Sequence, residues 1–278
     1  MVFDEFAQFY VNEKYEKLDK LGEGAFGIVY KGQNKLTKEF VAIKEVNLKN
    51  LESFMSKEDL KKEIKFMKIF NNNPNSVKLY EDFEENDILY MVIELCDTDI
   101  TKCLEKSEKG FTIYEVKIVM KQFNNILQDI RKKDMIHNDV KLENVLVKFG
   151  EAKEFQIKLI DYGQAKLISS TKDLSNNEWG ITPYTEGGNE IISIVEKVDL
   201  LNLGIDIFRM LFKEAYKTLE YMNEKIENCI EDKDLKDLMR RLLVDDYKKR
   251  IDWDDYFNHD FFKIDKFEFD KVINIVKE

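Results

Sequence analysis

The chain has few cysteines and almost no proline. Its 3 cysteines, Cys96, Cys103 and Cys229, form neither a metal-binding spacing nor the even-numbered set of a disulfide framework. We therefore expect reduced thiols in a cytosolic protein. The 2 prolines, beside abundant Lys, Asn and Ile, indicate a compositional bias of the genome and carry no functional information.

The chain also lacks an excess of positive charge and a long hydrophobic run. A formal net charge of -11 argues against general binding to nucleic acid or to an anionic membrane, because both need a basic surface. No apolar run reaches the roughly 20 residues of a membrane span, and the start MVFDEFAQFY lacks the basic region of a signal peptide. We expect a cytoplasmic protein, with a nuclear location left open, that binds no nucleic acid and does not insert into membranes.

What the chain does contain is enough apolar material for one large domain or two lobes. Hydrophobic residues make up 44% and charged residues 36% of its 278 residues, which indicates a folded globular protein. Residues 15–46 alternate apolar and polar side chains, which predicts two strands joined by a glycine-rich turn and then a third strand. Apolar residues recur at helical spacing over Lys57–Phe70, and the segments VKLYEDFEE and ILYMVIEL predict a strand pair.

After Leu95 the helical period dominates. The segments VLVKF and FQIKLID predict two short strands. The predicted helices are Phe111–Lys132, Glu196–Phe212, Met222–Ile230 and Leu235–Leu243. The simplest organisation is a β-rich N-terminal lobe and a helical C-terminal lobe, hinged near residues 94–97.

Five short motifs succeed one another over most of the chain. They are GEGAFGIV from Gly22, VAIK ending at Lys44, KKEI containing Glu63, HNDVKLEN from His137, and DYG from Asp161. Each is weak alone. In this order and at these separations they predict a site that holds ATP and two metal ions and transfers the terminal phosphoryl group.

The residues after the glycine run decide how it is interpreted. A dinucleotide-binding fold needs a helix after G-x-G-x-x-G, whereas here Val29 and Tyr30 begin a second strand. This pattern favours a hairpin over phosphates, in which Gly22, Gly24 and Gly27 let the backbone approach closely. The alternative is an ordinary tight hairpin, which would not need three glycines.

The charged motifs supply the remaining chemistry. Lys44 lies in an apolar strand, and we expect an ion pair with Glu63 on the inward side of the predicted helix; the alternative is a lysine that faces solvent. Asp139 can accept a hydroxyl proton and Lys141 can neutralise the γ-phosphate. The metal ligands are expected to be Asn144 through its amide oxygen and Asp161 through its carboxylate, with Gly163 permitting a sharp turn.

These motifs resemble those of the eukaryotic protein kinase family, and the resemblance covers Tyr15–Phe262. It implies an α+β, bilobal protein kinase fold with a β-rich N-lobe (15–94), one main helix in that lobe, and a mainly helical C-lobe (97–262). Residues 1–14 would be an N-terminal extension and residues 263–278 a C-terminal tail.

The resemblance also implies roles for individual residues. Asp139 would be the catalytic base and Lys141 the phosphate contact, with Lys44 and Glu63 as the supporting pair. Further implied roles are an internal spine (His137, Tyr162, Met67, Leu79), a gatekeeper (Ile93) and a helix anchor (Asp199, Gly204). The nucleotide would contact Leu21, Gly22, Glu23, Gly24, Ala25, Phe26, Gly27, Ile28, Val29, Ala42, Lys44, Glu94, Cys96 and Leu146, with Val29 and Ala42 above the adenine and Leu146 beneath it.

The position of Lys141, two residues after the base, is similar to serine/threonine-directed members of the family. The implied partner is a protein substrate with a Ser or Thr acceptor. The segment VKLEN and the closing segment from Arg250 resemble the calcium/calmodulin-type and the autophagy-initiating (Unc-51-like) branches.

Three positions depart from the family pattern. Asn138 replaces the arginine that receives an activating phosphate, so we expect phosphorylation of the 169–175 segment (Ser169, Ser170, Thr171, Ser175) not to switch the enzyme on, and control by constitutive order or by a regulatory protein partner. Tyr162 replaces phenylalanine and adds a hydroxyl that needs a partner. Gly187 and Gly188 stand where proline and glutamate belong, so Arg250 is predicted to lose its ion pair unless Glu186 or Glu190 reaches it.

Two alternatives remain open at this point. A pseudokinase, a nucleotide-binding scaffold with little turnover, usually lacks one of Lys44, Asp139 and Asp161, and all three are present. The degenerate segment ITPYTEGGNE, in which Thr182 lies one place late, keeps this alternative open. A kinase of small molecules is the third interpretation, against which the segment after DYG resembles a peptide-binding loop.

Overall fold

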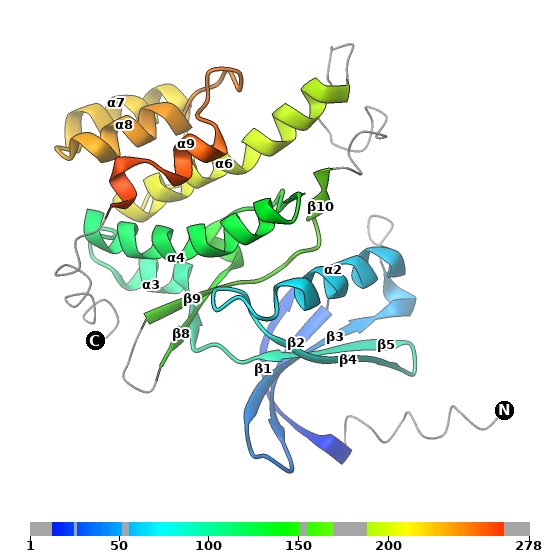
Figure 1. Cartoon of the computed structure of the whole chain (residues 1–278). Helices are drawn as coiled ribbons and strands as arrows, with labels where there is room; N and C mark the ends of the chain where they lie inside the picture. The colour runs from blue at the N-terminus through cyan, green and yellow to red at the C-terminus, as the bar shows by residue number, and fades with distance from the viewer. Residues whose placement is uncertain (1–12, 25–26, 52–55, 151–154, 169–187, 264–278) are drawn as a thin grey trace. The chain divides into compact units, whose positions relative to one another are not determined.

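The structure is a computed structural model that describes residues 13–24, 27–51, 56–150, 155–168 and 188–263 (Figure 1). The chain divides into two compact units, one formed within residues 1–97 and 161–163 and the other within residues 98–160 and 164–278. The short segment Asp161–Gly163, which the sequence assigned to the second lobe, thus groups with the first unit. The predicted domain boundaries themselves stay predictions.

The first unit is built on a five-stranded antiparallel sheet in the order β1-β2-β3-β5-β4 (Figure 1). The strands predicted from residues 15–46, VKLYEDFEE and ILYMVIEL are all present. Their bounds are β1 (Tyr15–Gly24), β2 (Gly27–Asn34), β3 (Phe40–Asn47), β4 (Leu79–Glu85) and β5 (Ile88–Glu94).

The register of the sheet sets predicted site residues side by side. Lys44 on β3 pairs with Val29 on β2 and with Met91 on β5. Ala42, two residues before Lys44 and therefore on the same face, pairs with Ile93 on β5. Strands β2, β3 and β5 are therefore neighbours that are joined by backbone hydrogen bonds.

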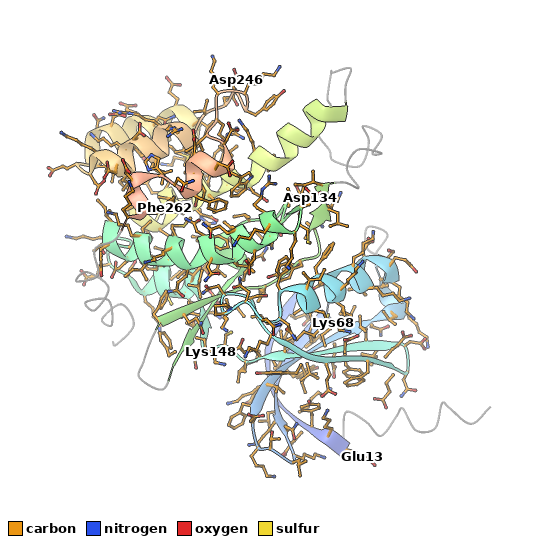
Figure 2. The ribbon with its side chains drawn as sticks, in the orientation of Figure 1. Glu13, Lys68, Asp134, Lys148, Asp246 and Phe262 are labelled. Atoms are coloured by element: carbon orange, nitrogen blue, oxygen red, sulfur yellow. The ribbon has the colours of Figure 1, made fainter. Side chains whose placement is uncertain are left out.

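Helix α2 (Lys57–Phe70) has the bounds that the sequence predicted. Ser56 caps its N-terminus: the Ser56 hydroxyl accepts from the Asp59 amide, and the Asp59 carboxylate accepts from the Ser56 amide. Lys68 lies in its last turn (Figure 2). Its Nζ pairs with Asp82 Oδ1 of β4 at 2.5 Å. The helix buries a stripe of side chains that are mostly apolar: Leu60, Glu63, Ile64, Phe66, Met67 and Phe70.

The second unit is mainly helical. Its strands are short: β6 (Thr98–Asp99), β8 (Val145–Phe149) and β9 (Phe155–Leu159) form one sheet, and β7 (Met135–Ile136) pairs with β10 (Lys166–Leu167). Its helices are α3 (Ile100–Lys106), α4 (Ile113–Lys132), α6 (Gly188–Phe212), α7 (Leu219–Cys229), α8 (Lys233–Leu242) and α9 (Trp253–Phe257), with short 3-10 turns at Leu142–Asn144 and Asp260–Phe262. A β-rich first unit with α2 as its main helix and a mainly helical second unit confirm the predicted α+β fold class.

Helix α6, which covers the helix predicted over Glu196–Phe212, is the apolar centre of the second unit. Leu200, Leu203, Ile207 and Phe208 are fully buried. A Cβ on Gly204 would lie 2.9 Å from Leu242 and Leu243 side-chain carbons, so this glycine permits the close approach of α8. The predicted start at Glu196 was wrong, since the helix already runs from Gly188.

The apolar character of α6 is that of a buried helix and not of a membrane span. Within the ranges that the structure describes, no helix combines the length and the hydropathy that crossing a bilayer requires.

Candidate active site

The glycine-rich hairpin joins β1 to β2 in the first unit. Gly27 has φ +137°, and a Cβ there would overlap the carbonyl oxygen of Glu45. The fold itself therefore demands glycine at this position. At Gly22 and Gly24 a Cβ would meet nothing within 4 Å, so the described part of the chain leaves open space beside them. Ala25 and Phe26, at the tip, lie outside the described residues.

The ion pair predicted between Lys44 and Glu63 is present. Lys44 Nζ on β3 lies 2.9 Å from Glu63 Oε1 on α2, and the two side chains are 20% and 5% exposed. The helix places Glu63 on its buried stripe, so the carboxylate has little contact with water. This pair fixes an ammonium group against the face of the sheet.

Two of the predicted nucleotide contacts, Glu94 and Cys96, lie at the end of β5 and just after it. Glu94 is buried, and its amide donates to the Lys78 carbonyl at 2.8 Å. Cys96 is half-buried, as is Ile93. Leu146 lies on β8 of the second unit. Their contacts with a nucleotide stay predictions.

The DYG motif adopts a tight turn whose left-handed residue is Asp161. Its φ is +64°, and its Oδ1 accepts a hydrogen bond of 3.1 Å from the Gly163 amide. Aspartate tolerates this conformation because its side chain bonds the local backbone. The sequence assigned the turn to the freedom of Gly163, which is not itself in the left-handed region. The hydroxyl of Tyr162 has the partner that it needs, the hydroxyl of Ser76 at 2.7 Å.

The catalytic-loop residues cluster in the second unit. Asp139 Oδ2 accepts from Lys141 Nζ at 2.7 Å and from Asn144 Nδ2 at 3.0 Å. Asn144 Nδ2 also donates to the Asp139 carbonyl at 2.9 Å. The backbone is held too, since the Ile160 amide donates to the Asn144 carbonyl at 2.9 Å. The loop thus presents a carboxylate, an ammonium and an amide oxygen together.

Helix α6 supports this loop through Asp199. Its Oδ2 accepts hydrogen bonds of 3.1 Å from the amides of His137 and Asn138. Burial raises the pKa of Asp199 to about 6, against the lowering effect of these amide donors. Asn138 has φ +61°, a left-handed conformation that asparagine adopts more readily than most residues. The departure at Asn138 therefore suits the local backbone.

A second support from α6 was missed by the sequence analysis. Arg209 forms a two-pronged pair with Glu143, at 2.5 and 3.2 Å, and a 3.2 Å bond to Asp206. Burial raises the pKa of Asp206 to about 8. Asp206 and Arg209, the only two charged residues in the segment LLNLGIDIFRMLF, were the available signal, because buried charges need partners.

Arg250 is held by backbone carbonyl groups. Its guanidinium donates to the backbone carbonyls of Lys197 at 2.7 Å and of Val244 at 2.7 and 3.1 Å. These carbonyl oxygens satisfy its planar donors, and the predicted loss of its ion pair, unless Glu186 or Glu190 reaches it, stays a prediction. The side chains of both glutamates lie outside the described part.

The structure thus assembles two groups of predicted residues, one in each unit. The first unit holds Lys44, Glu63 and Asp161, and the second holds Asp139, Lys141 and Asn144. That the two groups act on one substrate stays a prediction. The candidate regulatory positions fall outside the described residues: Ser169, Ser170, Thr171, Ser175, Thr182, Tyr184, Glu186 and Gly187.

Comparison with known proteins gives the family. The family model described as "Protein kinase domain" matches residues 15–262. Calcium-dependent protein kinase 5 of Plasmodium falciparum (isolate 3D7) is 30% identical over 97% of this chain and 48% of its own length. Serine/threonine-protein kinase atg1 of Dictyostelium discoideum is 34% identical over 87% of the chain and 38% of its own length.

A third relative, cyclin-dependent kinase-like 1 of Caenorhabditis elegans, is 32% identical over 73% of the chain and 56% of its own length. The chain therefore spans between 38% and 56% of the length of these three relatives. The family match itself covers most of the chain. The chain belongs to the protein kinase family, and its relatives include a protein named a serine/threonine-protein kinase.

Proposed function

We propose that this chain is an ATP- and Mg²⁺-dependent enzyme that transfers the γ-phosphoryl group to Ser or Thr hydroxyls of protein substrates. The observation that carries the proposal is the hydrogen-bonded cluster of Asp139, Lys141 and Asn144. A base, a cation and a metal-binding amide within one short loop are the groups that phosphoryl transfer requires.

The transfer itself is assigned to Asp139 and Lys141. Asp139 accepts the proton of the acceptor hydroxyl while that oxygen bonds to the γ-phosphorus. The bond from phosphorus to the β,γ-bridging oxygen breaks, and ADP leaves. Lys141, whose side chain is 42% exposed, offsets the charge on the transferring group.

The donor set fits magnesium. Among the described residues, no three His, Cys, Asp or Glu side chains gather into a metal site of their own. Magnesium does not need such a cage, since it usually takes one or two carboxylates together with substrate phosphates. Asn144 uses its Nδ2 to bond Asp139, which leaves its amide oxygen for another role. Asp161 and Asn144 would hold the ions, which would neutralise phosphate charge when bound.

The nucleotide is assigned to the first unit. Lys44, fixed by Glu63, would pair with the α- and β-phosphates. The open space beside Gly22 and Gly24 suits the close passage of phosphates.

Serine and threonine as acceptors are supported by Lys141 and by the relative whose name includes "serine/threonine-protein kinase". A cytoplasmic location, with a nuclear one left open, is part of the proposal. Because Asn138 replaces the arginine that receives an activating phosphate, activity is controlled by constitutive order or by a regulatory protein partner.

The test is direct. The purified chain is incubated with labelled Mg-ATP and a mixture of proteins, and the label is assigned to amino acids after hydrolysis. Phosphoserine and phosphothreonine are the expected products. Tight ATP binding without transfer would instead indicate a pseudokinase, and label on small molecules alone would indicate a different class of kinase.

The glycines of the hairpin provide a prediction with a built-in comparison. Gly24→Ala is expected to leave stability unchanged but to raise KM for ATP roughly tenfold, because the methyl group points into space that the phosphates would use. Gly27→Ala is expected to lower the free energy of unfolding by about 1–3 kcal/mol, because of its φ and the overlap with Glu45. Denaturant titrations and ATP saturation curves separate the two effects; equal effects on both would contradict the assignment.

A further inference from the structure

The hydroxyls of Ser76 and Tyr162 form a buried polar contact inside the first unit. They lie 2.7 Å apart although 86 residues separate them along the chain. Ser76 is fully buried and Tyr162 is 1% exposed. Removing one partner of a buried hydrogen bond is unfavourable.

Ser76 is held in place by the asparagine-rich segment between α2 and β4. The Ser76 amide donates to the Asn73 carbonyl at 3.1 Å, and the Asn75 amide donates to Asn73 Oδ1 at 2.8 Å. Asn71 closes the segment by exchanging two hydrogen bonds with the backbone of Leu79, at 2.7 and 2.8 Å. Ser76 is therefore a fixed point and not a mobile surface hydroxyl.

Tyr162 is joined to α2 as well. Its ring stacks on Phe70, the last residue of α2, with centroids 5.3 Å apart and an interplanar angle of 16°. Asp161 precedes it directly in the chain, in the left-handed conformation described above. Stacking restrains the plane of a ring but allows it to slide, whereas a hydrogen bond from its tip has a direction. The two contacts together define where the DYG backbone lies.

We infer that Ser76 is a positioning residue for Asp161, acting through the hydroxyl of Tyr162. The bond ties the metal-binding aspartate to the connection after α2, the helix that also carries Glu63. This inference rests on the proposed function, in which Asp161 holds Mg²⁺. Tyrosine at this position then has a use that phenylalanine could not have.

The pairing of two hydroxyls makes the inference testable by removal of one or both. Ser76→Ala removes the 2.7 Å hydrogen bond of the buried Tyr162 hydroxyl, and removing one partner of a buried hydrogen bond is unfavourable. We expect the DYG backbone to shift in response to the lost hydrogen bond, and this shift moves Asp161. Ser76→Ala with Tyr162→Phe removes both hydroxyls, so the strain disappears and the stacking on Phe70 is retained. Tyr162→Phe alone has a milder effect, since Ser76 Oγ also lies 3.4 Å from the Val77 carbonyl.

The measurement is the affinity for ATP with and without Mg²⁺, by calorimetry on the whole chain. Ser76→Ala is expected to reduce the enhancement that Mg²⁺ gives to ATP binding roughly tenfold, with metal-free ATP affinity unchanged. The double variant should regain most of the enhancement. Thermal unfolding of the nucleotide-free variants gives a second readout: the double variant should be more stable than Ser76→Ala.

A matched control exists in the second unit. Tyr256, also buried, bonds Asn124 Oδ1 at 2.8 Å, and Asn124→Ala removes that partner far along the chain from DYG. It should lower the melting temperature without changing the Mg²⁺ enhancement.

Three results would count against the inference. An unchanged Mg²⁺ enhancement in Ser76→Ala, or a double variant as impaired as the single one, would overturn it while leaving the proposed function intact. No Mg²⁺ enhancement in the unaltered chain would overturn both. If Ser76→Ala does not fold, Tyr162→Phe and the double variant still decide: the inference needs the double variant to fold and to bind Mg-ATP at least as well as Tyr162→Phe.

Discussion

Replacing Asp139 with asparagine is expected to lower kcat for protein phosphorylation by about 10³-fold, within the range found for loss of a general base. The side chains have nearly the same shape, and the asparagine oxygen can still accept from Lys141 and Asn144, which lie 2.7 and 3.0 Å from Asp139 Oδ2. The fold and the loop should therefore survive. What is lost is the capacity to take the acceptor's proton.

The kinetic pattern distinguishes this loss from a loss of binding. The affinity for Mg-ATP should stay within a few-fold of the unaltered chain, because the nucleotide is assigned to Lys44 and the glycine-rich hairpin. Asp129→Asn is the matched control: this carboxylate lies on α4 near Lys132, at 3.9 Å, and its loss should leave kcat unchanged. Full activity in Asp139→Asn would show that Asp139 is not the catalytic base.

How far the sequence determines this structure differs from element to element. The bounds of α2 were predictable because Ser56 and Asp59 form a capping box and the apolar stripe ends at Phe70. The five strands of the first unit were predictable from alternation alone. The short strands β6, β7 and β10 were not, because two residues carry no period.

Helix α6 shows the opposite limit. Its apolar core from Leu200 to Phe208 was evident, but the start was placed at Glu196 instead of Gly188. Helix α4 was placed more closely: it begins at Ile113, two residues inside the predicted start at Phe111, and Thr112 and Glu115 form a capping box there. Capping residues are a signal that can be recognised in the sequence.

The same contrast applies to the site. The motif residues and the Lys44–Glu63 pair could be predicted from residue type and spacing. The residues that contact the motif residues could not be predicted. Ser76 contacts Tyr162 across 86 residues, and no sequence pattern connects them. Arg250 illustrates why, since a guanidinium can be satisfied by backbone carbonyls whose positions only the fold determines.

Replacing Lys44 with methionine is expected to reduce kcat/KM for ATP by about 10²–10³-fold, comparable with the loss of other preorganised electrostatic groups. It should also lower the free energy of unfolding by about 1–3 kcal/mol, because the Glu63 carboxylate, 5% exposed, would be left buried without its cation. The two effects have different causes, so a second substitution can separate them.

Lys44→Met combined with Glu63→Gln removes the uncompensated charge. Stability in denaturant titration should return most of the way, while activity stays low, because no ammonium remains for the phosphates. Lys17→Met is the matched control in the same sheet: Lys17 pairs with Glu45 at 2.7 Å but is 36% exposed, so its loss should cost under about 1 kcal/mol and leave kcat/KM unchanged. If activity recovered together with stability in the double variant, Lys44 would serve the fold and not the nucleotide.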